Sequence, residues 1–162
     1  MKFDPEIKAA VLTASDTRTK ATDESGTVLV GLLLGLGIGV TERVIVPDEF
    51  DAIRQALTGF ADEARVDLIL TTGGTGFAER DVTPEATLAV IDREAPGIAE
   101  AIRHETAAKT KFAMLSRAVA GIRGKTLIIN LPGSPKGVRE CFAVFEPVLV
   151  HAVDLLRGKS EH

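Results

Sequence analysis

Two aspartates that follow apolar runs are the residues best suited to chemistry in this sequence. Asp48 comes directly after VTERVIVP, and Asp81 ends the stretch TTGGTGFAERD, which follows DLIL. If both apolar runs are parallel strands of one sheet, their carboxyl ends open on the same crevice and both carboxylates face it. Mg²⁺ favours such a site, since it takes few protein carboxylates together with waters and substrate phosphates. Helix capping is the alternative, and for either aspartate alone it is the commoner role.

The glycine cluster before Asp81 is a candidate phosphate site. In Gly73, Gly74, Thr75 and Gly76, bare glycines let backbone N–H groups converge on an anion, and the threonine hydroxyl adds a donor. A tight strand-to-helix turn explains these residues about equally well. The cluster matches neither GxxxxGK[ST] nor GxGxxG, the two familiar nucleotide-binding patterns.

A second phosphate candidate is PGSPKG, which precedes the last helical segment. Ser134 is placed to cap that helix, and Lys136 lies in its first turn. A lysine there opposes the helix dipole, but a phosphate bound at the helix start makes it favourable. The alternative is a solvated lysine on an ordinary capped helix.

Short apolar runs alternate with segments of helical period, which predicts the elements that position these loops. We expect strands at 8–14, 40–46 and 67–72, and a hairpin of 116–122 and 125–131. We expect helices after caps at Asp23, Thr83 and Ser134, and over 48–64 and 96–108. This order predicts a three-layer α/β/α sandwich, with a mostly parallel sheet and an antiparallel edge strand.

Composition narrows the class of protein. We expect residues 1–157 to form one domain and residues 158–162 a short tail. The net charge of -4 argues against nucleic acid or an anionic membrane as partner, which leaves small molecules. The N-terminus has no signal-peptide pattern, and the most apolar window is too short to span a bilayer. Cys141 is the only cysteine, so we expect a buried structural thiol and a reducing, cytoplasmic location.

Three stretches carry a resemblance to a known family. TTGGTGFAERDVTPEATLAVIDRE, SRAVAGI and INLPGSPKG resemble the molybdopterin-binding domain of MogA and MoaB proteins and of the gephyrin G domain. The resemblance covers nearly the whole chain. It implies molybdenum cofactor biosynthesis by a molybdopterin adenylyltransferase. In that reaction the terminal phosphate of molybdopterin attacks the α-phosphate of ATP, giving adenylyl-molybdopterin and pyrophosphate, with Mg²⁺ assisting.

The resemblance also implies roles for individual residues. The family's two functional aspartates fall on Asp48 and Asp81, which would be catalytic and would position Mg²⁺ and the ATP phosphates. The substrate- and nucleotide-binding residues would be Ser15, Asp16, Ser25, Gly73, Gly74, Thr75, Gly76, Ser134 and Lys136. Among them, Ser15, Asp16 and Ser25 would meet the pterin, and the others would contact phosphates.

The resemblance also implies an oligomeric state and a partner, and it leaves alternative activities open. It implies a homotrimer or a dimer of trimers (homohexamer), and a molybdenum-insertion enzyme as a possible partner. One alternative is a MoaB-type, non-catalytic molybdopterin-binding or carrier protein. Another is a different nucleotide-processing enzyme built on the same domain. The role of Ser116-Arg117 is left open.

Overall fold

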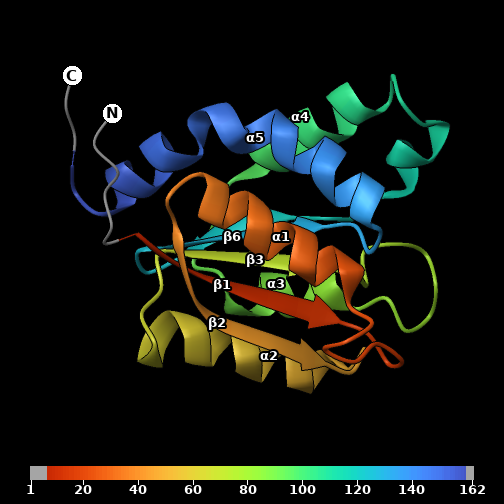
Figure 1. Ribbon diagram of the computed structural model, residues 1–162, viewed down its shortest axis with the longest axis horizontal. Coiled ribbons are helices and arrows are strands. Elements are labelled where there is room, and N and C mark those ends of the chain that lie inside the picture. The colour runs from red at the N-terminus through yellow and green to blue at the C-terminus, as the bar shows by residue number, and fades with distance from the viewer. Residues whose placement is uncertain (1–6, 160–162) are drawn as a thin grey trace.

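The computed structural model describes residues 7–159, which form a six-stranded sheet covered by helices on both faces (Figure 1). The strands are β1 (Lys8–Ala14), β2 (Gly39–Val46), β3 (Leu68–Thr72), β4 (Arg93–Glu94), β5 (Ala120–Arg123) and β6 (Thr126–Leu131). The α-helices are α1 (Glu24–Gly35), α2 (Phe50–Thr58), α3 (Thr83–Val90), α4 (Pro96–Thr106) and α5 (Pro135–Leu156). A π-helical turn, η1 (Gly59–Glu63), extends α2, and a 3₁₀ helix, η2 (Lys111–Leu115), follows α4. The predicted three-layer α/β/α sandwich is confirmed.

The sheet has the strand order β2-β1-β3-β6-β5-β4. β2, β1, β3 and β6 run parallel, so their carboxyl ends lie at one edge, while β5 is antiparallel to both β6 and β4. Both outer strands are irregular. β4 has only two residues, and the register of β2 against β1 shifts between Ala9 and Ala10.

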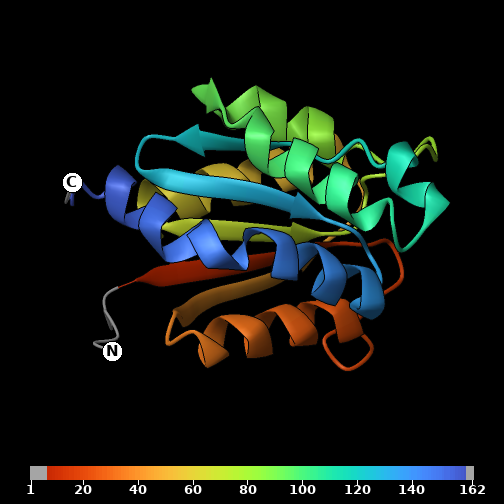
Figure 2. The same ribbon diagram turned by 90° about the horizontal axis from the view of Figure 1, so that it is seen from above.

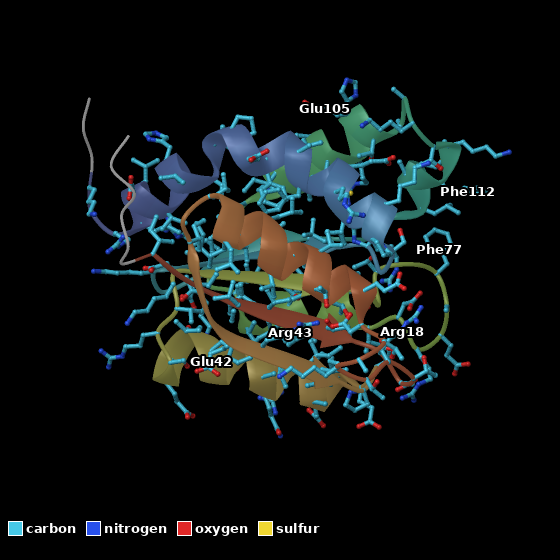
Figure 3. All side chains as sticks on the ribbon, in the orientation of Figure 1. Arg18, Glu42, Arg43, Phe77, Glu105 and Phe112 are labelled. Atoms are coloured by element: carbon cyan, nitrogen blue, oxygen red, sulfur yellow. The ribbon has the colours of Figure 1, made fainter. Side chains whose placement is uncertain are left out.

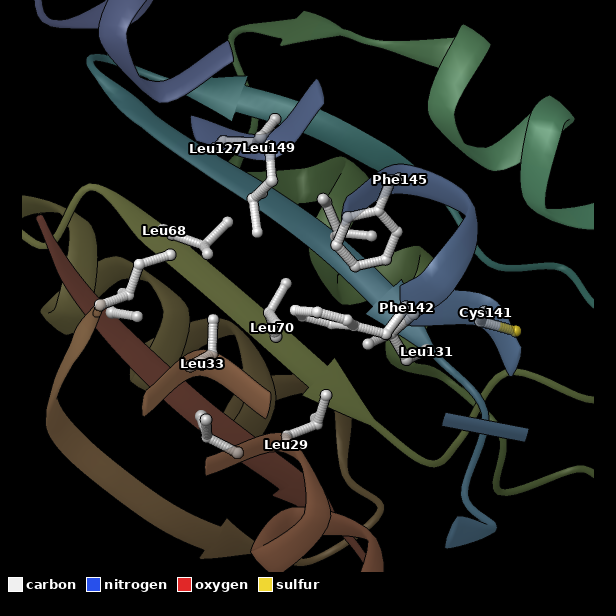
Figure 4. Packing of buried hydrophobic residues seen from close by; sticks show 14 of the residues in the cluster. Leu29, Leu33, Leu68, Leu70, Leu127, Leu131, Cys141, Phe142, Phe145 and Leu149 are labelled. Atoms are coloured by element: carbon white, nitrogen blue, oxygen red, sulfur yellow. The ribbon is translucent and has the colours of Figure 1, made fainter. Parts of the chain in front are cut away.

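Alternate residues of the central strands supply two hydrophobic cores. The helices α1, α4 and α5 cover one face of the sheet (Figure 2). Val11, Leu70 and Ile129 pack against them, and Figure 4 shows the part of this core around Phe142. Leu12 and Ile128 pack with α2 and α3 on the opposite face. Strands with two buried faces must be apolar at successive positions, which explains their unbroken hydrophobic runs.

Several boundaries differ from the expectation. The helix expected over 48–64 is α2 followed by η1, and the strand expected over 116–122 begins only at Ala120. Thr83 is not the cap of α3. Val82 holds that position, and the Thr83 hydroxyl donates to the carbonyl of Gly73. The elements β4 and η2 have too few residues to show a period, so the sequence pattern missed them.

Two other expectations concern the ends and the membrane. Residues 160–162 of the expected tail, and the first six residues of the stretch judged not to be a signal peptide, lie outside the described residues. Every helix within residues 7–159 is too short or too polar to cross a bilayer.

Substitution of Phe142 tests how much its packing stabilises the larger core. The ring is buried and packs edge-to-face on Phe145, with 5.1 Å between ring centroids. Phe142→Ala should lower the free energy of unfolding by roughly 3–5 kcal/mol, because it removes apolar contacts and leaves a cavity. Urea denaturation measures this loss.

The matched control is Val148→Ala on the same helix, where the side chain is 52% exposed. It should change the free energy of unfolding by no more than roughly 0.5 kcal/mol. Equal losses in the two variants would contradict the packing described for α5.

Candidate active site

Four loops meet where the parallel strands end, at the right of Figure 1. They follow β1, β2, β3 and β6, and they contain the predicted site residues except Ser25 and Lys136, which lie in the first turns of α1 and α5. Two aromatic side chains from neighbouring segments, Phe77 and Phe112, lie at this same end (Figure 3). Both are exposed, at 70% and 65%, so they offer apolar surface beside the polar loops.

Asp16 and Asp48 join the first two loops by reciprocal hydrogen bonds. The Asp16 N–H donates to Asp48 Oδ2 at 3.1 Å, and the Asp48 N–H donates to Asp16 Oδ1 at 3.0 Å. Arg80, from the third loop, binds Asp16 through two nitrogens, at 2.6 and 3.0 Å. Residues 64 positions apart are thus tied together, and Asp48 is held against the third loop.

The same contacts make the two carboxylates electrostatically different. The Arg80 guanidinium, and then the Asp48 N–H, hold the pKa of Asp16 below its ordinary value. Burial raises the pKa of Asp48, and the negative charges of Asp16 and Asp81 raise it further. Asp48 therefore carries its charge at a cost that a cation at this site would relieve.

The glycine loop needs its glycines for backbone reasons. Gly73 and Gly74 have φ of +95° and +70°, in the left-handed region that favours glycine. A Cβ on Gly73 would lie 2.4 Å from the carbonyl oxygen of Ala14, and one on Gly74 would lie 2.3 Å from Thr83 Oγ1. The glycines therefore do form a tight strand-to-helix turn, which was the alternative to a phosphate site.

The backbone of this loop is also open to a ligand. The Gly73 N–H donates to the Leu131 carbonyl and is not available, contrary to its expected role as a phosphate donor. The N–H groups of Gly74, Thr75 and Gly76 have no acceptor within residues 7–159. Three consecutive free donors can bind an anion, so the turn and the phosphate site are compatible.

The start of α5 packs directly on the glycine loop. Thr72 Oγ1 donates to the Pro132 carbonyl at 2.6 Å, and a Cβ on Gly133 would lie 3.3 Å from the Gly73 Cα. Ser134 caps α5 as predicted, accepting from the Gly137 N–H at 3.1 Å. The two phosphate candidates, about 60 residues apart in sequence, therefore form one surface.

Three other predicted site residues, Lys136, Ser15 and Ser25, are either highly exposed or already close to polar groups of neighbouring residues. The Lys136 side chain is 86% exposed, and its amine is 3.9 Å from Glu140 of the next turn. Ser15 Oγ accepts from the N–H groups of Thr17 and Arg18, so it organises its own loop. Ser25 is buried, and its hydroxyl lies 3.5 Å from Asp23, the residue that caps α1.

The carboxylates fit a magnesium ion by their donor atoms. Asp81 Oδ2 accepts from the Ala78 N–H, while Asp81 Oδ1 and Asp48 Oδ1 have no hydrogen bond within residues 7–159. No group of three or more potential metal-binding side chains occurs in that part of the chain. Two free carboxylate oxygens suit Mg²⁺, which completes its shell with water and phosphate oxygens.

Hollows occur on both sides of this surface. A groove of about 450 Å³ is lined by Asp48 itself and by sequence neighbours of the two aspartates: Glu49, Phe50, Glu79, Arg80 and Val82. A more apolar cavity of about 250 Å³ lies beside the start of α5 and is lined in part by Pro132, Ser134 and Cys141. Burial raises the pKa of the Cys141 thiol to about 11, so it is not a nucleophile at neutral pH.

Two arginines that organise the site escaped the sequence prediction. Arg80 was not singled out, although a basic residue directly before a candidate aspartate is a usable signal. Arg117 was left open as a surface residue, but its guanidinium reaches the glycine loop and Glu85. No local pattern could place it there, because the contact spans 41 residues of sequence.

Known proteins resemble this chain over most of its length. Residues 10–151 match the family model described as "probable molybdopterin binding domain". Molybdenum cofactor synthesis protein cinnamon of Drosophila melanogaster is 47% identical over 93% of this chain, which spans only 26% of that protein. A molybdopterin adenylyltransferase of Helicobacter pylori is 44% identical over 94% of this chain and 89% of its own length. The crystal structure of molybdopterin biosynthesis enzyme MoaB from Thermus thermophilus is 47% identical, with a TM-score of 0.87 over 94% of this chain and 98% of that one.

Asp48→Asn tests the electrostatic cost at the site. Asparagine keeps an oxygen that can accept the Asp16 N–H but removes the charge. Because the folded pKa of Asp48 lies above its unfolded value, wild type loses stability as the pH rises from the unfolded pKa through the folded pKa, whereas the variant does not. The melting temperature of the variant, relative to wild type, should therefore be lowest below about pH 4 and higher at pH 7.

Asp51→Asn is the matched control, three residues away on α2, with a side chain 77% exposed. Its melting temperature relative to wild type should not change with pH in the same way. A clear loss of stability in Asp48→Asn at pH 7 would contradict the prediction.

Proposed function

Since this chain belongs to the molybdopterin-binding domain family of molybdenum cofactor biosynthesis, we propose that it is a molybdopterin adenylyltransferase. It transfers AMP from ATP to molybdopterin and releases pyrophosphate. An oxygen of the terminal phosphate of molybdopterin forms a bond to the α-phosphorus of ATP, and the bond from that phosphorus to the β-phosphate bridging oxygen breaks.

The observation that carries this proposal is the meeting of the two candidate phosphate sites, the glycine loop and the start of α5, beside two carboxylates. The transfer joins two phosphorylated substrates, so it requires two anion sites within bonding distance of each other. Free N–H groups of Gly74, Thr75 and Gly76 form one site, and the start of α5 with Lys136 forms the other. The hydrogen bond from Thr72 to Pro132 holds them together.

The residues of this chain need only to bind the two substrates, orient their phosphates and neutralise the phosphate charge. Phosphoryl and nucleotidyl transfer depend mainly on positioning and on stabilising charge, so no covalent nucleophile is required. Asp48 and Asp81 would hold Mg²⁺, which neutralises phosphate charge and aligns the reacting groups when bound. Asp16 and Arg80 position Asp48 through the hydrogen bonds between their loops.

The alternative is a carrier that binds molybdopterin without adenylylating it. The presence of both aspartates favours catalysis, since a carrier has no need of a metal-binding pair. The similarity to a named molybdopterin adenylyltransferase over nearly its full length favours catalysis as well. A homotrimer or dimer of trimers, a molybdenum-insertion partner and a cytoplasmic location complete the proposal.

The decisive measurement is ATP-dependent formation of adenylyl-molybdopterin and pyrophosphate with Mg²⁺. Asp48→Ala and Asp81→Ala should each lower kcat/KM by about a hundredfold or more, because each removes charge that positions the phosphates. Both variants should still bind molybdopterin, measured by its fluorescence.

Asp51→Ala, on the exposed side of α2, serves as the control and should retain activity. Wild-type protein that binds molybdopterin but releases no pyrophosphate would support the carrier and contradict the transferase.

A further inference from the structure

We propose that Arg117 is a positioning residue for Asp81, acting through the backbone of the glycine loop. Its three guanidinium nitrogens each donate a hydrogen bond. Nε donates to the Gly76 carbonyl at 2.7 Å, Nη2 to the Asp81 carbonyl at 2.6 Å, and Nη1 to Glu85 at 2.7 Å. The Arg117 N–H also donates to the Thr75 carbonyl, at 2.9 Å.

These hydrogen bonds hold both ends of the loop segment 76–81. Gly76 and Asp81 begin and end the segment 76–81, and the guanidinium spans the distance between their carbonyls. Within the described chain, the backbone hydrogen bonds that leave this segment all end on Arg117. Within that part of the chain, the side-chain ties to other loops come from Arg80, which binds Asp16 and lies 3.9 Å from Glu49.

Asp81 depends on this closure because, among residues 7–159, its carboxylate accepts a hydrogen bond only from within the loop. Asp81 Oδ2 accepts from Ala78, and the Asp81 N–H donates to the Ala78 carbonyl. Both contacts would move with the loop if it shifted. The Asp81 carboxylate also needs a glycine at position 76, since a Cβ there would lie 2.9 Å from Asp81 Oδ2.

Lysine cannot replace this arginine. A planar guanidinium has donors in a fixed fork that reaches two carbonyls and a carboxylate together, whereas an ammonium is a single point. Glu85, in the first turn of α3, fixes the orientation of the fork by binding Nη1.

Two measurements test this role of Arg117. The first is an activity assay, and it rests on the proposed function. In the adenylylation assay, Arg117→Lys and Arg117→Met should lower kcat/KM by about 10- to 100-fold, as loss of a residue that orients a metal-binding side chain does. The Mg²⁺ concentration for half-maximal rate should rise in both. In the Asp81→Ala background, Arg117→Met should cause little further loss, since its effect passes through Asp81.

Arg123 is the matched control. It also donates three hydrogen bonds, two to Asp62 and one to the Val90 carbonyl, but none of its partners lies in the site loops. Arg123→Lys and Arg123→Met should lower the melting temperature to a similar degree as the Arg117 variants while retaining kcat/KM and the Mg²⁺ requirement.

The second readout is amide hydrogen exchange, which needs no activity. The hydrogen-bonded N–H groups of segment 76–81, those of Ala78 and Asp81, should exchange faster in Arg117→Met than in wild type or Arg123→Met. Faster exchange without any adenylylation by wild type would refute the transferase and leave the positioning role standing. Unchanged exchange, a loss equal to that of the Arg123 variants, or losses that multiply with Asp81→Ala would each overturn the role of Arg117.

Discussion

Burial of the central strands on both faces is the constraint from which the rest of the structure follows. β1, β3 and β6 are buried along almost their whole length, so they must lie inside the sheet. Parallel strands need crossover connections, and these supply α1 to α4, while α5 after the last strand completes the cover of one face. The same arrangement brings the carboxyl ends of four strands to one edge. The location of the site is thus fixed by packing, before any residue with chemical function is considered.

The site concentrates negative charge that the fold only partly balances. Arg80 satisfies Asp16, while Asp48 is left partly buried with Asp16 and Asp81 as like-charged neighbours. Such a cluster of negative charges lowers stability when no cation is bound. Its position beside free N–H groups is typical of a site that binds a metal together with phosphates. The two arginines act differently. Arg80 neutralises a carboxylate, whereas Arg117 binds mainly carbonyl oxygens and sets the shape of a loop.

Local patterns were enough to predict the layers of the fold, the caps at Asp23 and Ser134, and the loops that form the site, because each depends on residues close in sequence. They could not show that the Gly73 N–H is bonded to Leu131 or that Thr83 binds Gly73 instead of capping α3. Those partners are set by which strands are neighbours and by the path of the turn. The chemical role of the site residues stays a prediction from the sequence.

The two irregular edges of the sheet have a consequence for self-association. An exposed strand edge presents unpaired N–H and C=O groups and invites uncontrolled strand addition by other chains. On one side, β4 is too short to template such growth. On the other, β2 is long enough, but the register shift against Ala9 and Ala10 interrupts its ladder, and Glu42 and Arg43 place charges along it (Figure 3). The protein can therefore expose both edges at high concentration with reduced risk of aggregating as extended β-sheet.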